Sequence, residues 1–152
     1  MVKIIVSLLL LAIPITATTD LVDIPDQLYS EYKCMKLALH YEARGESSRG
    51  MQAVANVIMN RVNSERFPNS VCGVVYQKHR NTCQFSWHCD PRVSKREPTV
   101  GIKAKLLAFE AVVNNSLRDI TGGALWFHSG EGSSWSESKQ LTRQIGNHKF
   151  YR

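Results

Sequence analysis

The sequence lacks three features that would indicate other classes of protein. Its longest apolar run, residues 4–13, is shorter than the about 20 residues that a transmembrane helix needs. The chain also contains neither an internal repeat nor a low-complexity block. With 152 residues, 43% of them hydrophobic, it is instead typical of one globular domain that can bury a core.

The spacings of common metal sites are also missing. There is no Cys-x-x-Cys pair and no helical His-x-x-x-His pair, so we expect no bound metal and no cofactor. An even number of cysteines in an exported protein is typical of disulfides. We therefore expect two disulfides among the four cysteines, which are Cys34, Cys72, Cys83 and Cys89.

The first 17 residues are typical of a secretory signal peptide. Lys3 precedes the apolar run, and Pro14 and small residues follow it up to Ala17. We expect an exported protein of the periplasm or cell wall, which contacts the membrane only transiently through residues 1–17. Ile15 is an imperfect residue before a cleavage site at Ala17, which leaves a slowly released anchor as the alternative.

The chain is basic, with a formal net charge of +6, and is therefore attracted to acidic polymers. Its lysines and arginines are spread along the chain, and no recognition-helix pattern accompanies them. We therefore expect no nucleic-acid partner. An anionic polymer of the cell envelope suits an exported protein better.

Hydrophobic periodicity predicts an α+β domain that is mainly α, with a small β or irregular lobe. Residues 18–31 have no clear periodicity and are predicted to be a lead-in linker to a domain over 32–152. Helices are predicted over 32–43, 51–62 and 99–117, the last capped by Thr99. A short strand or helix is predicted over 71–76, a strand over 124–128, and the irregular lobe over 77–98.

One face of the helix predicted over 51–62 carries a row of amides. Gln52, Asn56 and Asn60 are spaced four residues apart, which places them on one side of the helix. We interpret this row as a solvated face. The alternative is that it borders a cleft and contacts sugar hydroxyls.

The most informative segment of the chain is 41–50, in which Glu42 and Glu46 stand four residues apart. Gly45 predicts a left-handed helix cap, so we expect Glu42 in the last helical turn and Glu46 in the loop beyond it. The negative end of the helix dipole and partial burial both raise the pKa of a carboxyl group. A raised pKa is what a glycosidase needs in its proton donor; the alternative is a solvated surface glutamate.

An ordered set of motifs extends over most of residues 34–151. The motifs are Tyr41-Glu42-Ala43-Arg44-Gly45-Glu46-Ser47 with Gly50, Asn60-Arg61-Val62, Phe67-Pro68, Cys72-Gly73-Val74-Val75-Tyr76-Gln77, Cys83-Gln84-Phe85-Ser86-Trp87, Cys89-Asp90, Thr121-Gly122-Gly123-Ala124, His128 and Ile145-Gly146-Asn147-His148. Each motif alone is weak, but the ordered set is specific. It resembles that of the SleB-type spore cortex-lytic and cell-wall hydrolases.

This resemblance implies a lysozyme-like fold related to resuscitation-promoting factors and soluble lytic transglycosylases. It also implies cleavage of peptidoglycan glycan strands between N-acetylmuramic acid and N-acetylglucosamine by residues 32–152, which we expect to act as a monomer. The family's acid maps onto the Glu-Ala-Arg-Gly-Glu motif. We assign it to Glu42 from the helix-end argument and keep Glu46 as the reserve candidate.

Sugar-binding clefts combine aromatic faces with amide and hydroxyl groups. Such residues gather in the irregular lobe and near the Gly-rich turn at 121–123. For Trp126 and His128 a structural role is an equal alternative. The residues expected to bind substrate are Gln84, Ser86, Trp87, Trp126, His128 and Trp135.

We further expect lytic transglycosylation, because the sequence offers no second carboxylate with a setting as distinctive as that of Glu42. For the disulfides, four cysteines allow three pairings. We expect Cys72 to pair with Cys89 across the lobe and Cys34 to pair with Cys83, which would fasten the lobe to the helix of Glu42.

Three other functions remain open at this point. A muramidase would hydrolyse the same bond, and a wall-binding module would keep the fold without catalysis. A zinc amidase would need about three protein ligands. The histidines available for it are His79, His88, His128 and His148. The sequence is compatible with both a bacterial autolysin and a phage endolysin.

Overall fold

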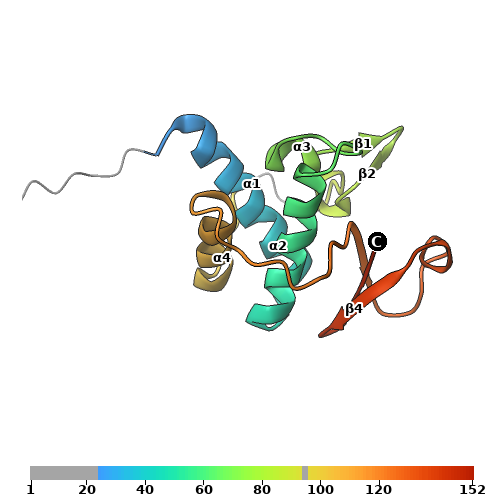
Figure 1. The fold of residues 1–152 in the computed structure, drawn as a ribbon. Coiled ribbons are helices and arrows are strands. Elements are labelled where there is room, and N and C mark those ends of the chain that lie inside the picture. The colour runs from blue at the N-terminus through green and yellow to red at the C-terminus, as the bar shows by residue number, and fades with distance from the viewer. Residues whose placement is uncertain (1–23, 94–95) are drawn as a thin grey trace, which may run out of the picture.

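A computed structural model describes residues 24–93 and 96–152 of the chain (Figure 1). Within these residues the helices are α1 (Asp26–Ala43), α2 (Ser48–Val62), α3 (Val71–Val75) and α4 (Ile102–Val112), with 3₁₀ turns at Ser86–His88 and Ser136–Ser138. The strands are β1 (Lys78–His79), β2 (Thr82–Cys83), β3 (Trp126–Ser129), β4 (Leu141–Ile145) and β5 (His148–Tyr151). The predicted class, α+β and mainly α, is confirmed.

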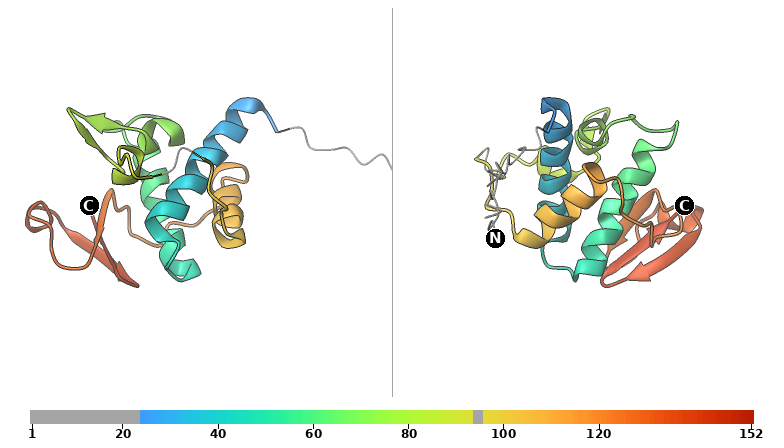
Figure 2. Two further views of the ribbon diagram at one scale, coloured as in Figure 1. Left: turned by 180° about the vertical axis from the view of Figure 1, so that it is seen from behind. Right: turned by 60° about the vertical axis from the view of Figure 1, so that its left-hand side comes forward.

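Helix α2 lies at the centre of the fold and is buried on two sides. The larger core joins it to α1, α3 and α4 through side chains such as Val54 and Ile58. On its other side, Ala53 and Val57 pack against Ile145 and Phe150 of the C-terminal sheet. Both views in Figure 2 place this sheet on the opposite side of α2 from α1 and α4. Small or β-branched side chains on both faces let the two layers approach the helix.

The amide row of α2 is not solvated, which corrects both interpretations of it. The Asn56 side chain is 2% exposed, and it accepts a hydrogen bond from the backbone N–H of Ile120 at 3.1 Å. Gln52 and Asn60 donate to the same connection between α4 and β3. Their acceptors are the Arg118 carbonyl at 2.9 Å, the Ala124 carbonyl at 3.0 Å and the Thr121 hydroxyl at 3.3 Å. The row therefore fastens a loop to α2, because backbone groups there have no sheet partner.

Helix α1 begins at Asp26, six residues before its predicted start, so the prediction of a linker is wrong for residues 26–31. The added turns have a structural use. The Glu31 carboxylate accepts hydrogen bonds from the backbone N–H groups of Val71 and Cys72, which are unpaired donors at the start of α3. The remainder of the predicted linker, up to residue 23, and the predicted signal peptide lie outside the described residues.

Helix α4 starts later and ends earlier than predicted. Gly101, and not Thr99, is its N-cap residue, and the helix stops at Val112. Among the described residues, no helix is long and apolar enough to cross a membrane.

The C-terminal strands form an antiparallel sheet in the order β3-β5-β4. β3 covers the predicted strand with a shift of two residues at its start, whereas β4 and β5 were not predicted. In the register of β3 and β5, Trp126 pairs with Tyr151 and Ser129 with His148. A tight turn at Gly146, with φ of +59°, joins β4 to β5. The sheet thus presents His128 and His148 on neighbouring strands.

Two disulfides are present as predicted, but the predicted pairing is wrong. Cys34 is bonded to Cys72, with their Cα atoms 5.2 Å apart, and Cys83 to Cys89, with their Cα atoms 6.0 Å apart. The reason is that 71–75 is a helix packed on α1, so that Cys72 faces Cys34 directly. The hairpin β1–β2 and the following 3₁₀ turn bring Cys83 and Cys89 together locally.

We expect the two disulfides to differ in their contribution to stability. In the chain-entropy model, a bond across 38 residues stabilises by about 4 kcal/mol and one across 6 residues by about 2 kcal/mol. Replacing Cys34 and Cys72 by serine should therefore lower the free energy of unfolding more than replacing Cys83 and Cys89. Urea denaturation of both double variants measures this, and the reverse order would contradict it.

Candidate active site

Glu42 lies in the last turn of α1, as the sequence predicted, but the helix does not end in the predicted way. The C-cap residue is Arg44 in a right-handed conformation, and Gly45 is not among the glycines with positive φ. The chain turns instead at 44–46, and Ser47 then caps α2 by accepting a hydrogen bond from the Gly50 N–H at 3.1 Å. The short turn brings the C-terminal end of α1 close to the start of α2.

The Glu42 side chain lines a pocket of about 450 Å³, here called the Glu42 pocket. It lies between the helices, the irregular lobe and the C-terminal sheet, and most of its lining is polar. Glu42 is the only carboxylate among its lining residues. They are Tyr41, Glu42, Arg61, Gln84, Phe85, Phe127, His128, Ser129 and His148.

Arg61 forms the base of the Glu42 pocket and is 2% exposed. Its Nε donates a hydrogen bond to the Leu125 carbonyl at 2.7 Å. Its guanidinium carbon lies 5.3 Å from the ring centre of Phe67 and 5.6 Å from that of Phe85. Because planar guanidinium groups stack well on aromatic rings, this position suits arginine better than lysine.

Burial and charge act in opposite directions on Glu42. Burial raises the pKa of the Glu42 carboxyl above its ordinary value, and the positive charge of Arg61 partly offsets this. Burial likewise lowers the pKa of Arg61 to about 10, which the Glu42 carboxylate opposes. Arg61 therefore stays charged at neutral pH, while a larger share of Glu42 is protonated than in an exposed glutamate. A carboxyl group in this state can donate a proton.

The opposite wall of the pocket comes from the C-terminal sheet. His128 shares a hydrogen bond of 2.9 Å between its Nε2 and the Tyr151 hydroxyl, and its ring stacks on the Tyr151 ring. Trp135 packs edge-on against both rings, at centroid distances of 5.6 Å and 5.5 Å. These contacts hold the His128 ring in one orientation.

Glu46, the reserve candidate for the acid, is not among the residues that line the Glu42 pocket. Its carboxylate turns toward the β4–β5 turn, where Oε1 lies 3.5 Å from Nδ1 of His148. Glu46 thus lies in the loop beyond α1, as predicted. The carboxylates of Glu42 and Glu46 therefore lie in different surroundings, the first in the Glu42 pocket and the second beside His148.

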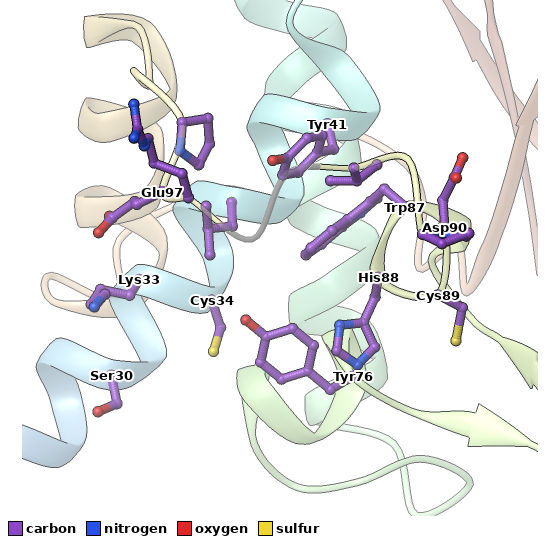
Figure 3. A pocket seen from close by; sticks show the side chains of 15 residues that line it. Ser30, Lys33, Cys34, Tyr41, Tyr76, Trp87, His88, Cys89, Asp90 and Glu97 are labelled. Carbon is purple, nitrogen blue, oxygen red and sulfur yellow. The ribbon is translucent and has the colours of Figure 1, made fainter.

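A second pocket, of about 760 Å³, lies on the other side of Tyr41 and is here called the aromatic pocket (Figure 3). The Trp87 ring stacks on Tyr41 with a centroid distance of 4.6 Å, and Tyr76 meets Trp87 edge-on. Tyr41 lines both pockets, so the aromatic pocket and the Glu42 pocket adjoin at this side chain. Its lining residues are Ser30, Lys33, Cys34, Leu37, Tyr41, Tyr76, Trp87, His88, Cys89, Asp90, Pro91, Val93, Arg96, Glu97 and Pro98.

The six residues expected to bind substrate are not all brought together. Gln84 and His128 line the Glu42 pocket, and Trp87 lines the aromatic pocket. Ser86 is exposed and lines neither. Trp126 and Trp135 also line neither pocket. Lys139 and Arg66 lie over the Trp126 ring at 3.7 Å and 4.8 Å from its centre. Trp135 packs edge-on against the His128 ring.

Sequence reasoning missed the role of Arg61, although the sequence carries a signal for it. Arg61 follows Val54 by seven residues and Ile58 by three, which places it on the apolar stripe of α2. A charged residue in such a stripe is buried and therefore needs partners. Phe127 and Ser129 were also missed. They reach the pocket only because β3 pairs with β5, which is a long-range contact.

The histidines considered for a zinc site are distributed over three places. His128 and His148 line the Glu42 pocket, His88 lines the aromatic pocket, and His79 lies on β1. Within residues 24–93 and 96–152, no three His, Cys, Asp or Glu side chains are grouped so that they could hold a metal ion.

The fold is similar to two solved structures. One is the catalytic domain of the Bacillus cereus SleB protein, with a TM-score of 0.65 and 31% identity over 82% of this chain and 91% of that one. The other is the catalytic domain of the germination-specific lytic transglycosylase SleB from Bacillus anthracis. Its TM-score is 0.65, with 32% identity over 80% of this chain and 93% of that one.

Curated relatives are similar over most of this chain. The spore cortex-lytic enzyme of Oceanobacillus iheyensis is 34% identical over 139 residues, which are 89% of this chain and 46% of that protein. The spore cortex-lytic enzyme of Halalkalibacterium halodurans is 31% identical over 123 residues, which are 80% of this chain and 34% of that protein. The chain thus spans less than half the length of these relatives.

A family model described as Cell Wall Hydrolase matches residues 45–151. The match begins just after Glu42, so it includes Glu46, Arg61 and both pocket histidines but not the candidate acid. It covers most of the folded domain and agrees with the relatives and the solved structures. The chain therefore belongs to the SleB-type cell wall hydrolase family, as its motifs predicted.

Proposed function

We propose that this protein cleaves peptidoglycan glycan strands between N-acetylmuramic acid and N-acetylglucosamine as a lytic transglycosylase. The observation that carries the proposal is the position of Glu42 as the only carboxylate lining the Glu42 pocket. Two relatives support it, because one is a spore cortex-lytic enzyme and another is the catalytic domain of a lytic transglycosylase.

Glu42 acts in turn as the acid and the base of the reaction. Protonated Glu42 donates its proton to the glycosidic oxygen, and the bond from muramic acid C1 to that oxygen breaks. The resulting carboxylate accepts the proton of the muramic acid C6 hydroxyl, whose oxygen bonds to C1. The product is a 1,6-anhydro sugar, Glu42 regains its proton, and no water is consumed. One carboxylate suffices because the substrate supplies its own nucleophile.

The rest of the Glu42 pocket suits this chemistry. The positive charge of Arg61 stabilises the Glu42 carboxylate that forms after proton donation. Gln84 and His128 provide polar groups for sugar hydroxyls on opposite walls. Trp87 and Tyr41 supply stacked aromatic faces in the adjoining aromatic pocket, where a further sugar of the strand can pack.

We further infer that the protein works outside the cytoplasm. Both cysteine pairs are oxidised, and disulfides of this kind persist in oxidising compartments. The substrate named above is found there. The basic charge of the chain favours contact with acidic wall polymers.

Replacing Glu42 by glutamine keeps the shape of the side chain and removes the transferable proton. We expect activity on purified peptidoglycan to fall about 10³-fold, with Glu46→Gln less severe. The exposed Glu65→Gln serves as the matched control with unchanged activity. An active Glu42→Gln beside an inactive Glu46→Gln would overturn the assignment of the acid.

The products distinguish the reaction from its alternatives. Lytic transglycosylation leaves muramic acid ends that are lighter by one water than those of a hydrolase. We expect mass spectrometry of digested peptidoglycan to find these anhydro ends in nearly all fragments. Reducing muramic acid ends would indicate a muramidase, free stem peptides an amidase, and intact strands with retained wall binding a non-catalytic module.

The charge of Arg61 should set the upper pH limit of activity. Since Glu42 must be protonated to start the reaction, activity falls as pH rises through its raised pKa. Arg61→Met removes the charge that lowers this pKa, so the loss of activity on the alkaline side of the pH–rate profile should move to higher pH. Arg61→Lys keeps the charge and should leave this alkaline limb of the profile in place. A pH–rate profile measured on folded protein tests this; an unmoved limb in Arg61→Met would contradict it.

A further inference from the structure

Glu46 occupies a site of its own, separate from the Glu42 pocket but in contact with one of its walls. Its side chain is 12% exposed, and the His148 side chain that faces its carboxylate is 6% exposed. The 3.5 Å between Oε1 and Nδ1 is longer than an ordinary hydrogen bond, and Nδ1 has no hydrogen-bond partner among the described residues. A buried carboxylate beside a buried imidazole is expensive in free energy unless the two groups interact.

Two glycines make room for this carboxylate. A Cβ atom at Gly50 would stand 2.8 Å from Glu46 Oε2, which is too close for two non-bonded atoms. A Cβ at Gly146 would overlap the same oxygen, and Gly146 also needs its positive φ for the β4–β5 turn. The start of α2 and the β4–β5 turn thus form a slot that the Glu46 carboxylate fills.

The Glu46 contact bears on the Glu42 pocket through His148. His148 lines that pocket and packs edge-on against Phe127, with ring centres 5.4 Å apart, so its ring has little freedom. A carboxylate at Nδ1 favours the tautomer that carries its proton there, which leaves Nε2 as a hydrogen-bond acceptor. The groups in Asp–His pairs of other enzymes are coupled in the same way.

The charge state of His148 depends on burial and on two neighbours, Glu46 and His128. Burial lowers the pKa of His148, Glu46 raises it and His128 of the adjacent strand lowers it. Glu42 and Arg61 line the same pocket. The direction of the shift favours a neutral imidazole at neutral pH, which is the form that can accept a hydrogen bond.

We propose that Glu46 is a positioning residue, whose carboxylate holds the proton of His148 on Nδ1 so that His148 Nε2 accepts a hydrogen bond from a sugar hydroxyl bound in the Glu42 pocket. Glu46 itself touches no substrate. The sugar part of this inference rests on the proposed function, whereas the tautomer of His148 does not.

The tautomer can be read directly in the protein without substrate. Nitrogen-15 NMR of the His148 ring should find a protonated Nδ1 and an unprotonated Nε2. Glu46→Gln can place an amide donor against Nδ1 and should move the proton to Nε2. Lys103→Met is the matched control, because Lys103 donates to the backbone carbonyl of Glu46 and not to its carboxylate. A wild-type His148 protonated on Nε2 would overturn the proposal.

Activity tests the consequence for the substrate. We expect Glu46→Gln to lower turnover of purified peptidoglycan about 10- to 100-fold per folded molecule, because a misaligned hydrogen-bonding group has an effect of this order. His148→Asn should have a similar effect, and the double variant should lose no more than either single variant. Lys103→Met should retain full activity.

The outcomes separate this inference from the proposed function. Independent, additive losses from Glu46→Gln and His148→Asn would overturn the positioning role even if Glu42→Gln is inactive. If Glu46 only stabilises the contact between the α1–α2 turn and the β4–β5 turn, Glu46→Gln will lower the melting temperature but leave turnover per folded molecule unchanged. This result would also overturn the positioning role. If Glu42→Gln is active, the proposed function fails while the NMR result stands.

Discussion

The burial of the Arg61 guanidinium is the interaction on which the site depends. It hydrogen-bonds the backbone before β3, lies over the rings of Phe67 and Phe85, and interacts electrostatically with the carboxyl group of Glu42. One side chain on the central helix therefore joins the helices, the irregular lobe and the C-terminal sheet. Its charge also lowers the pKa of the Glu42 carboxyl group, which opposes the larger upward shift caused by burial.

The two carboxylates of one short motif occupy different environments because the chain turns sharply between them. Glu42 ends α1 and lines the pocket, whereas Glu46 lies in a slot between two glycines and faces His148. A segment of five residues, 42–46, thus supplies the candidate acid and a residue that can orient the opposite wall. The family match, which begins between them at Gly45, covers only the second.

Local patterns predicted the parts of this fold that local forces decide. The central helix follows from the apolar spacing of Met51, Val54 and Ile58. Glu42 lies in the last turn of α1 as predicted, although the predicted left-handed cap at Gly45 is absent. The prediction that the amide row is solvated was wrong because Asn56 and Asn60 form hydrogen bonds with a loop that lies 64 residues further along the chain. The predicted cysteine pairing was wrong because the actual pairing depends on how α3 packs on α1. The wall of the Glu42 pocket that the C-terminal sheet forms was not predicted, because it depends on long-range strand pairing, which hydrophobic periodicity does not indicate.

Burial in the Glu42 pocket keeps Glu42 protonated to a higher pH than an ordinary glutamate. Carbon-13 NMR of the side-chain carboxyl carbons, with Glu42 assigned through Glu42→Gln, measures its titration in the folded protein. We expect a midpoint above that of an exposed glutamate. A midpoint at or below that of an exposed glutamate would mean that the Arg61 charge outweighs burial, and would contradict the role of Glu42 as proton donor.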